Sequence, residues 1–247
     1  MADLTLIRPD WPAPAAVRSC VTTRHGGVSR PPWDSFNLGA HVGDAPAAVA
    51  ANRHRLRRIA GLPAEPAWLD QTHGAEVVEA GDWAEPPAAD ASVSHRTGVV
   101  CAVMTADCLP VLFCAVNGAE VAVAHAGWRG LAGGVLEATL AAMATPNGEI
   151  MAWLGPAIGP RAFEVGDEVR QRFVAADGDA AGAFVAHRPG RWLADIYALA
   201  RRRLRKAGVT HLFGGDRCTY TERDLFFSYR RDGTTGRMAS LIWIEAR

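Results

Sequence analysis

The sequence has no excess of charge of either sign, because its 26 basic and 26 acidic side chains leave a formal net charge of zero. Nucleic acids and anionic membranes select proteins with surplus Lys and Arg, so neither partner is expected. No stretch approaches the roughly 20 apolar residues that a membrane-spanning helix requires. The first residues place Asp3 early and are broken by proline, which is not typical of a secretory signal.

Cysteine is also scarce, with five residues in a chain of 247 and no Cys-x-x-Cys pair. An odd number without such pairs does not make a disulfide framework. Hydrophobic residues make up 49% and charged residues 21%, an ordinary globular composition that supports a core without cross-links. We therefore expect a soluble cytoplasmic protein with reduced thiols.

No linker, repeat or shift in composition divides the chain, so we expect residues 1–247 to form one domain. Apolar periodicity and capping residues predict four helices, at 46–60 (with Asp44 as N-cap and Gly61 as stop), 135–144, 167–176 and 192–207. Seven runs are typical of strands, at 17–23, 75–80, 99–104, 111–116, 120–124, 149–154 and 240–244. The turn Asn117-Gly118-Ala119 favours an antiparallel hairpin. Several strands follow one another without a helix, which indicates an α+β fold with mixed β-sheets flanked by helices.

Three segments place a nitrogen or sulfur donor where an apolar run ends, and the donors are His73, Cys108 and His125. A catalytic zinc uses three protein ligands and leaves its fourth position for water or substrate. Thiolate with imidazole also suits copper, so the donors alone do not choose the metal. Sequence separations of 35 and 17 residues match no local metal signature.

The same residues allow other interpretations. Cys108 could be a buried inert thiol, and each histidine could be a satisfied polar group of the core or a turn. Alternatively, Cys108 and His125 could be a nucleophile and its base, with Asp107 or another carboxylate orienting the imidazole. The spacing does not separate these possibilities.

Glycine and arginine surround these segments. Gly127 to Gly134 lie between a strand and a helix, where backbone N–H groups and Arg129 would suit an anion, or where glycine would simply allow close packing. The stretch Thr23 to Ser29 suggests a loop folded over something polar, with Arg24 as a candidate phosphate contact. Asn37 in Phe-Asn-Leu-Gly could contact a base or sugar, or could close a turn. Two Phe residues at 226 and 227 are more typical of core filling than of ligand stacking.

The motifs TRHGGVS, FNLG, DQTHG, TADCLPVL, AHAGWRG, GPAIGP and CTYTERDLFFSYRRDGTTGRMASLIW together resemble the bacterial YfiH family, also called the laccase-domain or polyphenol-oxidase family. They run from Thr23 to Trp243, nearly the whole chain. The resemblance implies an α+β fold and a zinc held by His73, Cys108 and His125. One departure is Arg161-Ala162-Phe163, where the family often has Cys-Cys-Tyr.

The resemblance also implies an activity. Family members are described as purine nucleoside phosphorylases that act on adenosine, inosine and methylthioadenosine and also deaminate adenosine, or in other descriptions as copper polyphenol oxidases. Phosphorolysis needs a positioned phosphate and stabilisation of charge on the leaving purine. We assign phosphate to Arg24 and Arg129, ribose or base contacts to Asn37, Gln71 and Asp107, and proton transfer to Asp107.

Histidine content argues against laccase chemistry. A multicopper oxidase needs many histidines in His-x-His pairs, whereas this chain has eight, no two separated by a single residue. The expected cofactor is therefore zinc, with copper as an alternative, and the expected partners are purine nucleosides and phosphate, with a monomer as the default state. Two further hypotheses stay open: a metal-free Cys/His hydrolase acting on a peptidoglycan precursor, and a non-catalytic binding protein.

Overall fold

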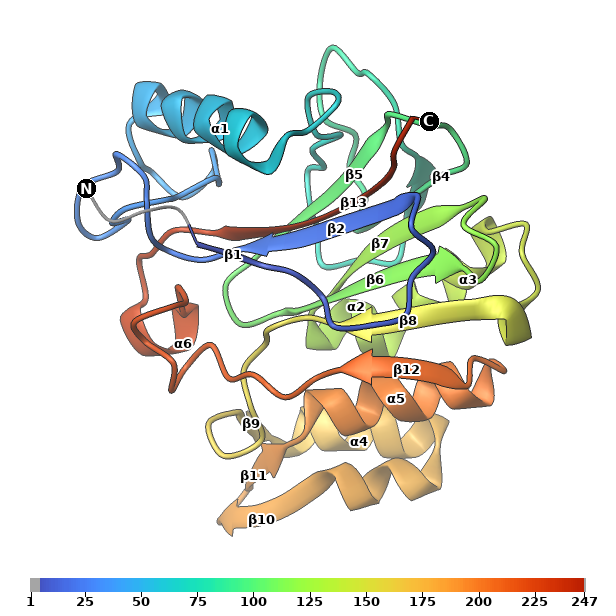
Figure 1. Cartoon of the computed structure of the whole chain (residues 1–247). Coiled ribbons are helices and arrows are strands. Elements are labelled where there is room, and N and C mark those ends of the chain that lie inside the picture. The colour runs from blue at the N-terminus through green and yellow to red at the C-terminus, as the bar shows by residue number, and fades with distance from the viewer. Residues whose placement is uncertain (1–4, 247) are drawn as a thin grey trace.

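The computed structural model describes residues 5–246, so Asp3 lies outside the described residues. A six-stranded sheet crosses the middle of the molecule (Figure 1). Its strands, in spatial order, are β12 (His211–Gly214), β8 (Ile150–Leu154), β6 (Leu109–Ala115), β7 (Val121–Ala126), β4 (Ala91–Ser94) and β3 (Val77–Glu79). The two outer pairs are parallel and the inner pairs antiparallel, so the sheet is mixed, as predicted.

A second, four-stranded sheet packs against the first (Figure 1). Its antiparallel strands, in spatial order, are β1 (Leu6–Ile7), β2 (Val17–Thr22), β13 (Met238–Ile244) and β5 (Val100–Thr105). The alternation of side chains along a strand explains the packing. In β6, Leu112 and Cys114 face the four-stranded sheet, whereas Val111 and Phe113 face the helices on the other side.

Helices cover the outer face of the six-stranded sheet. They are α2 (Trp128–Gly133), α3 (Val135–Ala142) and α5 (Ile196–Lys206). A third sheet, with β10 (Phe184–Arg188), β11 (Arg191–Ala194) and β9 (Glu164–Gly166), adjoins α4 (Asp167–Ala176). The remaining elements are α1 (Pro46–Ala60), α6 (Tyr229–Asp232) and the 3-10 turns η1 (Asn147–Glu149) and η2 (Gly178–Ala183). This arrangement confirms the predicted class of mixed sheets flanked by helices.

Most predicted elements form, with some corrections at their ends. The helix α1 has the predicted bounds and ends at Gly61 in the left-handed conformation, but its N-cap is Ala45 because the Asp44 carboxylate bonds elsewhere. The helix expected from residue 192 begins at Ile196, because residues 191–194 pair with β9 and β10. Its N-cap is Asp195, whose side chain accepts a hydrogen bond from the Ala198 backbone. The hairpin of β6 and β7 is antiparallel, as predicted.

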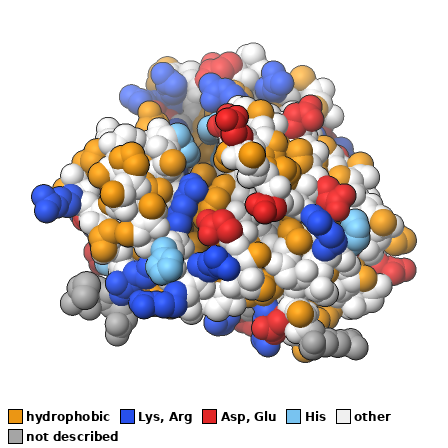
Figure 2. All heavy atoms as spheres, turned by 90° about the horizontal axis from the view of Figure 1, so that it is seen from above, with side chains coloured by type: hydrophobic (Ala, Val, Ile, Leu, Met, Phe, Trp, Pro, Cys, Tyr) orange, Lys and Arg blue, Asp and Glu red, His pale blue; other side chains and the backbone are white. Residues whose placement is uncertain are grey.

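The five cysteines are unpaired in the structure, which agrees with the prediction of free thiols. On the face seen in Figure 2, Lys and Arg side chains are interspersed with Asp and Glu side chains, so that face carries no extended charge of one sign. Within residues 5–246, no helix combines the length and the apolar character needed to cross a membrane.

Candidate metal centre and its cavities

The β6–β7 hairpin explains how Cys108 meets His125. Leu109, the first residue of β6, pairs with Ala126, the last residue of β7. Cys108 immediately precedes β6 and His125 lies one residue before the end of β7. The antiparallel register therefore brings the two side chains to one edge of the sheet, although they are 17 positions apart in the sequence.

The third member, His73, comes from the loop before β3. Its backbone φ of +63° lies in the left-handed region, which is uncommon for a residue with a side chain. The carboxylate of Asp90 holds this loop, because it accepts hydrogen bonds from the backbone N–H groups of Thr72, His73 and Gly74 at 3.1, 3.0 and 2.6 Å. The Asp90 hydrogen bonds thus stabilise an uncommon backbone conformation at His73, and this conformation orients the imidazole of that residue.

The three side chains converge. One donor atom from each of His73, Cys108 and His125 lies within 4.8 Å of the other two, and this is the one such group of three found among the described residues. Zinc bonds to nitrogen and sulfur are about 2.0–2.3 Å long, so small side-chain movements would bring all three donors onto one ion. His73 is exposed, Cys108 half-buried and His125 buried, so the group is open on one side.

Asp90 also fixes the orientation of His125. Its Oδ1 lies 2.7 Å from Nδ1 of the imidazole, and its backbone carbonyl accepts a hydrogen bond from the His125 N–H. This contact occupies Nδ1 and leaves Nε2 for an ion, as in the carboxylate–histidine pairs of known zinc sites. Asp107 was a candidate for the orienting carboxylate, but in the structure Asp90 holds that position.

The ionisation of the cluster favours a metal-binding thiolate. Burial raises the pKa of Cys108, but the neighbouring His125 and His73 outweigh it and lower that pKa to about 6. Burial lowers the pKa of His125, whereas the Cys108 thiolate and the Asp90 carboxylate raise it to about 9. The donors therefore fit a soft or borderline cation such as zinc or copper. A thiolate beside an imidazolium is also the pair that a cysteine nucleophile needs.

Three cavities adjoin the cluster and differ in character. The first, of about 420 Å³, includes His41, Gln71, Thr105, Tyr229 and Arg237 in its lining. The second, of about 270 Å³, is more apolar, and its lining includes Trp128, Ile158, Phe163, Ile196 and Arg230. The lining of the third, of about 280 Å³, includes two positively charged residues, Arg129 and Arg172. His73 borders all three, so the cluster lies where they meet.

Asp107 lies beside the cluster, but the protein's own donors occupy its carboxylate. The hydroxyls of Thr219 and Ser228 donate to it at 2.6 and 3.0 Å, and the backbone N–H of Arg230 donates at 2.7 Å. Its φ of +89° is also in the left-handed region. These contacts hold the segment that carries Tyr229 and Arg230 against the site. The structure thus gives Asp107 a positioning role, and the proton-transfer role predicted for it has no free carboxylate oxygen to support it.

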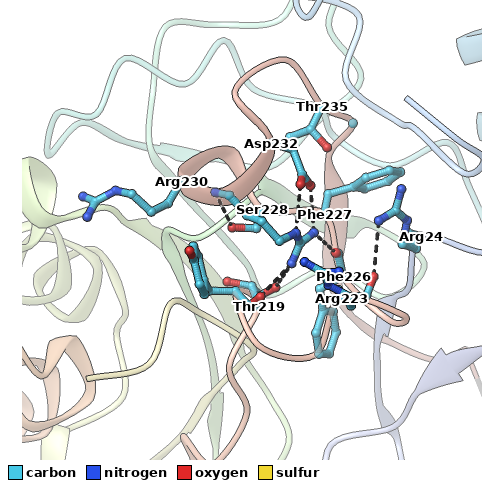
Figure 3. A network of polar contacts seen from close by, with 12 residues as sticks. Arg24, Thr219, Arg223, Phe226, Phe227, Ser228, Arg230, Asp232 and Thr235 are labelled. Atoms are coloured by element: carbon cyan, nitrogen blue, oxygen red, sulfur yellow. Dashed lines mark hydrogen bonds and ion pairs between the residues drawn. The ribbon is translucent and has the colours of Figure 1, made fainter. Parts of the chain in front are cut away.

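Arg24 is not brought to the cluster. Its guanidinium donates to the backbone carbonyls of Asp34 and Arg223 and lies 5.1 Å from the centre of the Phe227 ring. Figure 3 shows Arg24 and Arg230 extending in opposite directions from the network that surrounds Ser228. Arg24 therefore links the C-terminal segment that contains Arg223 and Phe227 to the N-terminal loop that contains Asp34. Its position does not support the predicted phosphate contact.

Asn37 is fully buried, and the protein's own groups occupy its amide. Its Nδ2 donates to Asp44 and to the carbonyl of Gly39, and its Oδ1 accepts from the N–H groups of Gly39 and Arg237. The polar group covered by the loop from Thr23 to Ser29 is Asn52 of α1, which bonds Val28 and Ser29. The base or sugar contact predicted for Asn37 is therefore replaced by a structural contact.

Gln71 and Arg129, by contrast, line the cavities. Gln71 exchanges two hydrogen bonds with the Met104 backbone, at 2.9 and 2.7 Å, which fixes its amide on the cavity wall. Arg129 is exposed and its guanidinium lies 4.5 Å from the Trp128 ring centre. Phe226 and Phe227 are fully buried, as predicted for core residues.

The sequence analysis did not single out His41 or Arg237 as site residues. Arg237 comes from the end of the chain and His41 from the loop before α1, and only the tertiary structure brings them to the cluster. Tyr229 follows the buried Phe226 and Phe227 in the sequence, but it is 62% exposed and borders two of the cavities. The sequence signal for Arg237 is limited to its place in the last motif of the family resemblance.

Together, the fold and this cluster define a mixed α/β protein with a His–Cys–His centre in an open cavity. A family model described as "multi-copper polyphenol oxidoreductase laccase" matches residues 18–245. The chain is 60% identical over 240 residues to the purine nucleoside phosphorylase YfiH of Escherichia coli strain K12, covering 97% of this chain and 98% of that protein. It is 59% identical, with the same coverage, to a protein named purine nucleoside phosphorylase in Pseudomonas aeruginosa.

Solved structures agree with these matches. A crystal structure of a Neisseria meningitidis protein superposes with a TM-score of 0.95 at 55% identity and covers 98% of this chain and 99% of that one. The YlmD protein of Geobacillus stearothermophilus gives a TM-score of 0.89 at 34% identity, with 100% and 98% coverage. This chain belongs to the YfiH family, whose family model is the polyphenol oxidoreductase laccase domain.

Proposed function

We propose that the chain is a zinc-dependent purine nucleoside phosphorylase acting on adenosine, inosine and methylthioadenosine, with adenosine deaminase activity at the same site. The observation that carries the proposal is the open His73–Cys108–His125 group at the junction of three cavities, in a chain similar over its whole length to proteins named purine nucleoside phosphorylase. We further propose that residues 1–247 act as one catalytic domain.

The cavities suggest how a nucleoside would lie. Trp128, Ile158, Phe163 and Ile196 offer an apolar wall for the flat face of a purine. The larger cavity is more polar and suits the ribose and a phosphate. The cluster at the junction would then face the glycosidic bond. This division would place the purine and the attacking group in different cavities, with the reacting carbon between them.

A metal held by the cluster would supply Lewis acidity next to the reacting atoms. The chain's own residues would bind and orient the substrate. Gln71 is fixed by Met104 and would present its amide to the ribose, and Arg129 would approach the substrate from the rim beside Trp128. The Asp107 network would hold Tyr229 over the opening.

One assay tests the proposal. The purified protein is incubated with adenosine and inosine, with and without phosphate, while its bound metal is measured. We expect a free base and ribose 1-phosphate in phosphate, and inosine formed from adenosine when phosphate is absent. Copper is the alternative metal, and the same preparation is tested with a phenolic substrate. A protein that oxidises phenols but leaves nucleosides unchanged would contradict the proposal.

A specific observation favours a second candidate. Cys108, His125 and Asp90 stand in the order of nucleophile, base and orienting carboxylate, and the lowered pKa of the thiol suits attack. A metal-free Cys/His hydrolase acting on a peptidoglycan precursor would use this arrangement. Such an enzyme would keep its activity after chelation and lose it on alkylation of Cys108, whereas a metal-dependent phosphorylase loses activity on chelation.

A further inference from the structure

An arginine faces the cluster, and no carboxylate among residues 5–246 forms an ion pair with it. Arg237 lines the largest of the three cavities together with His41, His73 and Cys108. The hydrogen bonds of its guanidinium run to the backbone carbonyls of Thr235 and Gly236, and Cys108 and Asp107 act on its charge without a direct hydrogen bond. A half-buried guanidinium that keeps free donors at a cavity wall is suited to an oxyanion.

His41 lines the same cavity as a neutral imidazole. Burial lowers its pKa, and the nearby charge of Arg237 lowers it further, whereas the Asp70 carboxylate acts in the opposite direction. A neutral imidazole donates one hydrogen bond through its ring N–H group. His41 therefore offers an anion a hydrogen-bond donor beside the charged guanidinium of Arg237.

A buried hydroxyl provides an independent observation. Thr105 lines the same cavity and is 2% exposed, yet its Oγ1 has no hydrogen-bond partner among the described residues. Buried polar groups in proteins normally have partners, and exceptions call for a ligand or another explanation. An oxygen of a bound anion would accept this hydroxyl's hydrogen.

The Phe36–Gly39 motif explains how Arg237 is held in place. Oδ1 of Asn37 accepts a hydrogen bond from the Arg237 N–H at 2.9 Å, and the Leu38 N–H donates to the Arg237 carbonyl at 3.2 Å. Gly39 is required beside it, because a Cβ there would lie 2.8 Å from Cγ of Arg237. The motif therefore acts on the site through Arg237.

We propose that Arg237, with His41 and Thr105, forms a subsite for inorganic phosphate in the largest of the three cavities, and that Asn37 is the positioning residue of this subsite. This inference rests on the proposed function, since phosphate is the second substrate of phosphorolysis. It assigns the phosphate to Arg237, whereas the sequence analysis assigned it to Arg24 and Arg129.

The test uses Arg237→Gln in the full chain, with Arg30→Gln as the control that removes one exposed positive charge elsewhere. With inosine as substrate, the KM for phosphate should rise at least roughly tenfold, because a charge-assisted hydrogen bond is lost, while the KM for inosine changes little. Arg237→Lys, which keeps the charge but not the forked donors, should give an intermediate KM. An unchanged phosphate KM in Arg237→Gln, or the same rise in Arg129→Ala alone, would overturn the assignment.

Direct binding separates this inference from the proposed function. Phosphate binding to the protein without nucleoside is followed by calorimetry or by ³¹P line broadening, and it should weaken in Arg237→Gln but not in Arg30→Gln. If the wild-type protein binds phosphate in this way but turns over no nucleoside, the proposed function fails and the subsite stands. If phosphate binds both variants equally, the subsite fails whatever the activity.

The positioning role has its own measurement. Asn37→Ala should raise the KM for phosphate in the same direction as Arg237→Gln while leaving the KM for inosine nearly unchanged, a split that general loss of structure would not produce. An equal change in both KM values would contradict the role of Asn37. If Asn37→Ala does not fold, Gly39→Ala is measured instead, because its added Cβ would lie against Arg237. The KM for phosphate should again rise while the KM for inosine stays nearly unchanged.

Discussion

The carboxylate of Asp90 accepts a hydrogen bond from His125 Nδ1 at 2.7 Å, and the same carboxylate holds the backbone that carries His73. One buried acid thus fixes two of the three residues of the cluster. Its position in the sequence, immediately before β4, gives no sign of this role. A substitution of Asp90 therefore perturbs the site without removing any of its three metal-donor atoms.

Asp90→Asn should weaken metal binding by roughly 10–100-fold, the usual effect of losing a carboxylate that orients a ligand. The amide would replace two acceptor oxygens by one and leave an N–H group facing the loop. Competition with a chelator of known affinity measures the effect. Ser94→Ala, at the far end of the strand that follows Asp90, is the control, since its hydroxyl bonds only to the backbone of Arg96. Wild-type affinity in Asp90→Asn would show that the orienting bond is dispensable.

Acid should remove the contribution of Asp90 to stability. Burial raises the pKa of its carboxyl, but His125, Gly74 and Thr72 outweigh this effect and hold the pKa below its ordinary 3.8. A depressed pKa means that the stabilisation is complete above the unfolded value and is lost as the pH falls through the folded value. The difference in unfolding free energy between wild type and Asp90→Asn should shrink as the pH falls below 3.8. A difference that grows in acid would contradict this account.

Replacing any one of His73, Cys108 and His125 by Ala should abolish stoichiometric metal binding and nucleoside turnover together, because two remaining donors hold zinc poorly. Metal content and initial rates are measured on the same preparations. Cys20→Ala is the matched control, because Cys20 is a buried thiol of β2 and does not line the cavities around the cluster. Full turnover by a variant that has lost its metal would reject the metal requirement.

Alkylation should distinguish Cys108 from the buried thiols. With a pKa of about 6, the Cys108 thiolate becomes more abundant as the pH rises through 6, so iodoacetamide should label it increasingly between pH 5 and 7 in metal-free protein. Burial raises the pKa of Cys20, Cys101 and Cys114 to about 12, so these should not react. Peptide mass spectrometry locates the label. Protection by added zinc is expected, and equal labelling with and without zinc would argue for the hydrolase.

Gly127→Ala tests how tightly the cluster is packed. A Cβ at Gly127 would lie 2.9 Å from the Cys108 Sγ and 3.2 Å from His73, so it should displace the thiol and lower metal affinity. Gly133→Ala in α2 is the control, because no atom lies within 4 Å of its added Cβ. That control should be neutral or stabilise by roughly 0.5–1 kcal/mol, as expected for removing glycine from a helix. Similar metal affinities in the two variants would contradict the packing argument.

Local sequence was enough to predict the main elements. Apolar periodicity located α1 and α4 with their observed ends, and the Asn117-Gly118 turn located the central hairpin. The short strands of the third sheet were missed, and so were β1, β4 and β12 of the other two sheets. Residues 191–194 were assigned to a helix because their strand pairing depends on β9 and β10, and no residue within that segment signals it.

The donor atoms of the cluster were predicted from their chemical type, but the supporting residues were not. Asn37 and Arg24 were assigned to a ligand because a polar side chain in a glycine-rich loop has no visible partner in the sequence. Their partners lie far along the chain, at Arg237 and Arg223. His41 and Arg237 were not predicted as site residues for the same reason, because they come close to the cluster only in the folded protein.

The placement of β13 has a consequence for how the protein is made. This strand lies between β2 and β5, with its first residue, Met238, paired with Thr105 at the cavity. During synthesis, the four-stranded sheet would lack the strand between β2 and β5 until residues 238–244 had left the ribosomal exit tunnel. Arg237, which immediately precedes that strand, would leave the tunnel just before it. The three donors, at positions 73, 108 and 125, therefore precede in the chain both the strand that completes the sheet and the arginine of the cavity lining.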